Sequence, residues 1–141
     1  MANVIPYAFR GELFTGTHNF ASGGDSFKLA LYTANPYNTS STVYVATSEV
    51  SASGTNYTTT GNALTGNAVV YATAVASCDF AYSTWSSSTF TAAFGAIYND
   101  DLGDNFCVVL DFSGNNTATY GTFKVSFPDP TTASNAIISM S

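Results

Sequence analysis

The feature of this chain that most constrains its fold is a set of short segments in which apolar and polar residues alternate. Every second position of residues 106–112 is Phe, Val or Leu, and residues 27–31 and 123–127 repeat the pattern. A period of two places one kind of side chain on one face of a strand. Gly, Asn, Ser and Thr separate these segments, and helical periodicity is almost absent. The pattern therefore predicts about eight short strands joined by turns.

We expect an all-β fold, an antiparallel β-sandwich of jelly-roll or immunoglobulin-like type, with a small barrel as the alternative. We expect segment 84–100 to be two strands or one long strand that bends at Gly95, and residues 99–105 to form a turn. The strands are expected at residues 26–33, 42–47, 67–73, 75–82, 84–100, 105–112, 122–128 and 135–141.

The N-terminal segment is the one place where a helix is expected. Pro6 suits a first helical position, and the residues after it can form a short amphipathic helix that Gly16 ends. The alternative is an extended arm. We therefore expect an N-terminal arm or helix over residues 1–24 and a β-sandwich over residues 25–141, in a single domain overall.

Charged residues are scarce, and this limits the possible functions. The 141 residues include three Lys and Arg against nine Asp and Glu, which gives a net charge of −6. Binding to nucleic acid or to an anionic membrane takes clustered Lys and Arg, so we expect neither partner. Catalysis needs titratable groups tuned by charged neighbours, which are few here. The composition favours a structural or binding protein over an enzyme.

Two groups could carry chemistry, and both have a simpler interpretation. His18 is the only histidine, and a nucleophilic triad would need it as the base, yet no G-x-S-x-G motif is present. We expect a hydrogen-bonded loop or interface histidine. Asp100, Asp101 and Asp104 form either a solvated hairpin loop or a Ca²⁺ site, and their spacing is not that of an EF-hand. We assign no catalytic, cofactor-binding or metal-binding residue.

Both cysteines lie inside apolar runs. Cys78 and Cys107 are expected to be small buried hydrophobic residues rather than a disulfide or a metal pair. The N-terminus has no basic region followed by an apolar stretch, so we expect synthesis in a cytoplasm, where thiols stay reduced.

Aromatic side chains keep a binding function open. Tyr37, Tyr44, Tyr57 and Tyr71 are expected to be exposed, where they could stack on sugars or line a protein interface. Trp85 lies in a strand segment and is expected in the core.

A series of short motifs follows in a particular order along nearly the whole chain. They are Glu12–Phe14, Gly16–Phe20, Asp25 with Phe27–Tyr32, Glu49 and Val50, Gly54, Tyr57, Gly61, Leu64, Phe80, Trp85, Thr89, Ala96–Asn99, Val109–Phe112, Gly121, Phe123, and Phe127 with Pro128. In this order they resemble a family of small all-β virion structural proteins of tailed bacteriophages, the capsid decoration or cement-like proteins. Residues Ala34–Ser41 depart from the pattern expected for that family.

The resemblance implies a non-enzymatic protein of the capsid surface, made in the host cytoplasm, that binds the major capsid protein and needs no cofactor. Self-association as a trimer or dimer is expected. A tail-associated or host-glycan-binding recognition module is the alternative, and a glycan hydrolase is a third. The contact with the partner is expected in the N-terminal segment, at Tyr7, Phe9, Arg10, Leu13, Phe14 and His18.

Overall fold

The computed structural model of the chain describes residues 3–72, 74–131 and 136–140. Its elements are helix α1 (Tyr7–Phe14), strands β1 (Phe27–Tyr32), β2 (Asn62–Ala63), β3 (Ala68–Ala72), β4 (Val75–Asp79) and β5 (Ser83–Asn99), the 3₁₀ helix η1 (Asp100–Leu102), and strands β6 (Asn105–Val125) and β7 (Ile138–Met140). None of the helices in these ranges has the length and apolar content needed to cross a membrane.

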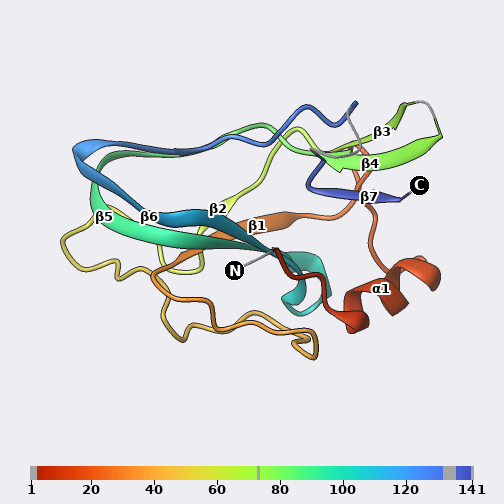
Figure 1. Cartoon of the computed structure of the whole chain (residues 1–141), viewed down its shortest axis with the longest axis horizontal. Coiled ribbons are helices and arrows are strands. Elements are labelled where there is room, and N and C mark those ends of the chain that lie inside the picture. The colour runs from red at the N-terminus through yellow and green to blue at the C-terminus, as the bar shows by residue number, and fades with distance from the viewer. Residues whose placement is uncertain (1–2, 73, 132–135, 141) are drawn as a thin grey trace.

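The strands form two antiparallel sheets that share one core. Four strands pair in the order β2-β1-β5-β6, and three pair in the order β3-β4-β7 (Figure 1). Leu29 and Ile97 from the first sheet lie in the same buried cluster as Cys78 and Ile138 from the second. The prediction of a β-rich fold with one short N-terminal helix is confirmed at this level.

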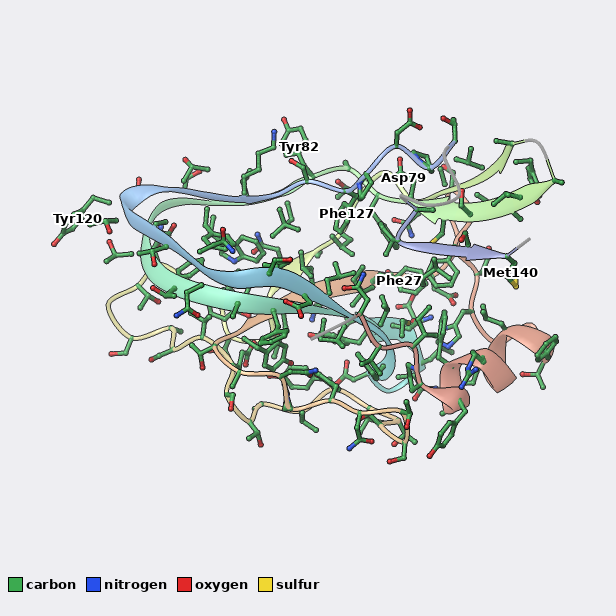
Figure 2. The ribbon with its side chains drawn as sticks, viewed as in Figure 1. Phe27, Asp79, Tyr82, Tyr120, Phe127 and Met140 are labelled. Atoms are coloured by element: carbon green, nitrogen blue, oxygen red, sulfur yellow. The ribbon has the colours of Figure 1, made fainter. Side chains whose placement is uncertain are left out.

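Strands β5 and β6 form one long hairpin that bends back over the core (Figure 1). Near the bend the strand register is interrupted on both sides of Ser88. Ser87 and Tyr120 adopt positive φ angles of 51° and 49° there, and Figure 2 shows Tyr120 at the bend. Such bulges curve a strand pair sharply. The hairpin therefore contributes to both sides of the core.

The bend was expected at Gly95, and this prediction was wrong. Gly95 pairs regularly with Leu31 and Leu110. A Cβ at this position would lie 2.9 Å from Cζ of Phe112 and 3.0 Å from Cδ1 of Leu29. Glycine is needed here because two large side chains pack directly against the strand backbone.

Strand β1 is buried on both faces, although the alternation of residues 27–31 indicated only one buried face. Ala30 and Tyr32 belong to a second core cluster on the face opposite Leu29 and Leu31. Residues 33–61 cover this face, and Tyr37 stacks on Phe106 within the cluster at 4.0 Å between ring centroids. On this side, the four-stranded sheet is therefore covered by the loop of residues 33–61 and not by other strands.

Two further strand predictions need correction. Residues 42–47 form no strand, and Val43 makes only an isolated bridge with Asn105. The segments 105–112 and 122–128 were expected to be separate strands, but β6 runs through the intervening residues and ends at Val125. Ser113 and Gly114 are accommodated within β6 at positive φ, next to a register shift.

Candidate partner-contact helix

Helix α1 has an inner and an outer face. Phe9 is completely buried and Leu13, four residues later, packs partly against the core. Tyr7, Arg10 and Phe14 follow the i, i+3, i+7 spacing of one helical face and are exposed, Phe14 by 92% and Tyr7 by 56%. Burial of Phe9 stabilises the docked helix by about 1.5–3 kcal/mol.

The six residues expected to contact a partner therefore divide into two groups. Tyr7, Arg10 and Phe14 are available to a partner. Phe9 and His18 lie in the core, with ring centroids 5.0 Å apart, Leu13 packs partly against the core, and these three residues hold the helix in place. The helix is thus docked on the sheets rather than extended as an arm. Its end near Gly16, which has a φ of 68°, agrees with the prediction.

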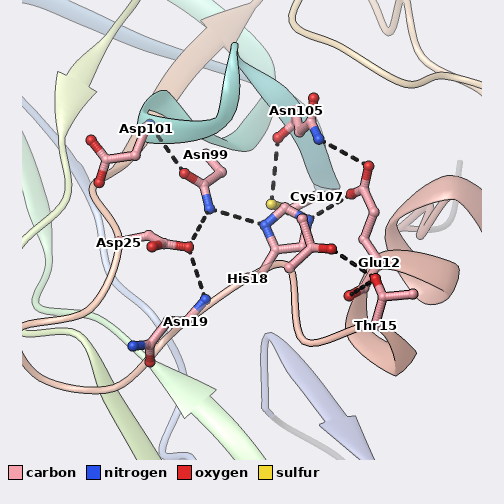
Figure 3. A network of polar contacts seen from close by, with 10 residues as sticks. Glu12, Thr15, His18, Asn19, Asp25, Asn99, Asp101, Asn105 and Cys107 are labelled. Carbon is pink, nitrogen blue, oxygen red and sulfur yellow. Dashed lines mark hydrogen bonds and ion pairs between the residues drawn. The ribbon is translucent and has the colours of Figure 1, made fainter.

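A chain of partly buried polar contacts joins α1 to the β5–β6 turn (Figure 3). Glu12 Oε2 lies 2.6 Å from His18 Nε2. Asn99 Nδ2 lies 3.0 Å from His18 Nδ1 and donates to Asp25 Oδ2 at 2.8 Å. Asn105 Nδ2 donates to the other carboxylate oxygen of Glu12 at 2.9 Å. We call Glu12, His18, Asp25, Asn99 and Asn105 the polar network.

The contacts around Asn99 determine the tautomer of His18. The Asn99 side-chain oxygen accepts from the backbone N–H of Asp101, so its amide nitrogen must face Asp25 and His18. An amide nitrogen only donates, and His18 Nδ1 is therefore the acceptor. The imidazole proton lies on Nε2 and is donated to Glu12. Both ring nitrogens of His18 are engaged in holding the helix.

The acidic loop also has a structural role. Asp101 Oδ2 accepts from the backbone N–H of Ser26 at 2.7 Å, and Asp100 pairs with Lys28 at 2.9 Å. These contacts fasten the β5–β6 turn to the start of β1. Within the described residues, no three His, Cys, Asp or Glu side chains are grouped so that they could hold a metal ion.

Both cysteines are free and buried, as expected. Burial raises the pKa of the Cys78 thiol to about 12. Burial raises the pKa of Cys107 well above its ordinary value, and the neighbouring Cys78 adds to this. Both side chains are therefore neutral thiols that fill the core.

The tyrosines expected to be exposed are mostly inside the molecule. Tyr37 and Tyr57 are buried, Tyr44 is half-buried, and only Tyr71 among the four is exposed. The sugar-stacking surface proposed for them was therefore wrong. The segments around Tyr37 and Tyr57 are rich in Ser, Thr and Asn, and they carried no sign that the loop would fold back on the sheet.

Glu49 organises these tyrosines, and sequence reasoning missed it. Its carboxylate accepts from Tyr44 at 2.7 Å, from Tyr57 at 2.8 Å and from the backbone N–H of Thr60 at 2.8 Å. Tyr57 in turn accepts from the backbone N–H of Leu31 at 2.9 Å. Burial raises the pKa of Tyr57 far above its ordinary value of 10.0. The cluster attaches the loop of residues 33–61 to β1.

A groove of about 530 Å³ is lined by both halves of β6. Phe112, Phe123 and Phe127 supply its apolar surface, and Asn116 and Lys124 stand among its polar residues. The Lys124 ammonium group lies 4.1 Å from the centroid of a neighbouring tyrosine ring, that of Tyr82. Grooves of this volume that combine apolar surface with a few polar groups are typical of ligand sites.

The chain matches no known protein-family model, no curated protein sequence and no solved structure.

Proposed function

We propose that this chain is a non-enzymatic structural protein of a tailed-bacteriophage virion. Its proposed role is that of a capsid decoration (cement) protein that stabilises the head shell by binding the major capsid protein. The proposal includes a β-sandwich of jelly-roll or immunoglobulin-like type and self-association as a trimer or dimer. The order of motifs described above supports the virion assignment.

The outer face of α1 is the observation that carries the binding part of the proposal. An aromatic side chain as exposed as Phe14 is unusual on a folded surface, and Tyr7 and Arg10 share its face. Tyr, Phe and Arg are enriched in protein interfaces. The opposite face is fixed by Phe9 and the polar network, so little conformational entropy is lost when a partner binds.

Co-sedimentation with assembled capsids stripped of minor proteins tests the proposal. We expect saturable binding of the wild-type chain. The variant Tyr7→Ala, Arg10→Ala, Phe14→Ala should bind at least about tenfold more weakly, because truncation of interface anchors costs more than about 1 kcal/mol each. Tyr120→Ala is the control, because Tyr120 is about as exposed as Phe14 and lies at the opposite end of the molecule (Figure 2). Absence of wild-type binding would refute the cement role.

The groove along β6 favours a second function, recognition of host glycans by a tail-associated module. Apolar rings with amide and hydroxyl groups around them suit the two kinds of surface that a sugar presents. Screening against host-cell glycans tests this function. Glycan binding that the substitutions Asn116→Ala and Lys124→Ala weaken, together with no binding to capsids, would support the tail-associated function in place of the cement function.

A further inference from the structure

One face of the three-stranded sheet packs on the core, and this face extends past the edge of the core. Val69, Cys78 and Ile138 form one cross-strand row on this face, and Cys78 and Ile138 are buried. The next row on the same face is Tyr71, Ala76 and Met140. Nothing in the described part of the chain covers this row, because Tyr71 is 81% and Met140 58% exposed.

The uncovered row borders an apolar notch. The notch has a volume of about 90 Å³ and lies where Leu13 of α1 and Phe20 approach Val69 and Met140. Figure 1 shows these three strands extending beyond the end of the four-stranded sheet, above α1, and Figure 2 places Met140 at this end. An apolar row of this kind at the margin of a sheet is typical of an interaction surface.

Strand β3 is an edge of its sheet and has none of the usual protection against pairing. Among the residues that the structure describes, it has a neighbouring strand on one side only, β4. Residues 67–78 contain no charged residue and no proline. Natural edge strands usually carry Lys, Pro or a bulge to prevent association with another chain.

We propose that β3 pairs antiparallel with β3 of a second copy of this chain, about a two-fold axis. The strand Ala68–Ala72 reads Ala-Val-Val-Tyr-Ala and is self-complementary about Val70. In that register Tyr71 of each copy lies opposite Val69 of the other, on the same face. Aromatic and β-branched residues directly opposite one another stabilise antiparallel pairs.

Charge favours a second copy over a basic partner. Each copy carries a net charge of −6, so two copies repel one another wherever acidic residues meet. The stretch 67–78 lacks charge, so it offers a place where two copies approach without this cost. A basic partner would gain no electrostatic attraction there.

The area indicates a weak dimer. Each aromatic side chain buries about 150–250 Å², so the two Tyr71 side chains contribute roughly 300–500 Å². The strand edges raise the total towards the lower bound of about 1,000 Å² for a specific interface. We therefore expect association at high concentration, as when many copies are held side by side.

Sedimentation velocity from about 10 µM to about 1 mM tests the inference. Wild type should shift from 14.7 kDa towards twice that mass as concentration rises. Tyr71→Glu should stay monomeric, because the substitution removes the aromatic contact with Val69 of the other copy and adds negative charge to two chains that already repel one another. Tyr120→Glu, at a tyrosine that is 89% exposed on the opposite end, should behave as wild type. Near-ultraviolet circular dichroism checks that both variants are folded.

Three results would overturn the inference: a wild-type chain that stays monomeric throughout, a trimeric mass, or equal behaviour of the two variants. The inference shares with the proposed function only the expectation that the chain associates with itself. The experiment contains no capsid, so its failure leaves shell binding open, and failure of shell binding leaves the dimer open.

Discussion

Replacing Asn99 by alanine removes the side chain at the centre of the polar network. Asn99 is completely buried. Its amide donates to the Asp25 carboxyl group at 2.8 Å and to His18 at 3.0 Å, and its carbonyl accepts from the Asp101 N–H at 3.1 Å. A hydrogen bond to a charged group contributes about 1.5–3 kcal/mol and a neutral one about 0.5–1.5 kcal/mol, so the expected loss from the three bonds is about 2.5–6 kcal/mol.

Urea denaturation measures this loss as a lower free energy of unfolding. Thermal unfolding should show a midpoint lowered by about 8–18 °C, since 1 kcal/mol corresponds to about 3 °C at this chain length. Asn115→Ala, at an exposed asparagine of β6, is the matched control and should change stability by less than about 0.5 kcal/mol. A loss below about 1 kcal/mol for Asn99→Ala would refute the view that the network fixes the helix.

A methyl group added at two glycines should act in opposite directions in the same denaturation assay. Gly95→Ala should destabilise the protein by about 1–3 kcal/mol, because the added methyl group overpacks the core. Gly11→Ala, in open space on α1, should stabilise the protein by up to about 1 kcal/mol. The reverse order of stabilities would contradict the packing described. Tyr57→Phe should cost about 1–3 kcal/mol, because the Leu31 N–H loses its acceptor, and an unchanged midpoint would show that Glu49 does not hold the loop. The folded thiols of Cys78 and Cys107 keep protons that the unfolded chain releases above about pH 9, so the free energy of unfolding should fall as pH rises from about 9 to 12. A flat profile over that range, measured by urea titration at each pH, would be inconsistent with buried thiols.

Local patterns predicted the elements whose signals lie within a few residues. The alternation in residues 27–31 gave β1, and Pro6 with Gly16 bounded α1 correctly. The apolar runs around Cys78 and Cys107 predicted their burial. In each case the relevant signal is the period of the segment itself or the conformational preference of one residue, both of which are readable without the rest of the chain.

Features that depend on distant partners were not readable. Asn99 meets His18 across 81 residues and Asp25 across 74. In the sequence Asn99 is simply one of several polar residues in a turn. Glu49 likewise stands in a segment rich in Ser and Thr, and its tyrosine partners come together only because the loop of residues 33–61 folds back on the sheet. The second buried face of β1 was missed for the same reason.

The attachment of the N-terminal segment has a consequence for synthesis on the ribosome. Val4 bridges Val109, and Glu12 accepts a hydrogen bond from Asn105, 93 residues later. At about 5–20 residues per second, the binding place for α1 emerges roughly 5–20 s after the helix itself. During that interval Phe9 has no core to enter. Nascent chains therefore expose the apolar side chains of α1 until residues 105–109 have left the ribosome, and this is the period when a chaperone would protect the yield of folded protein.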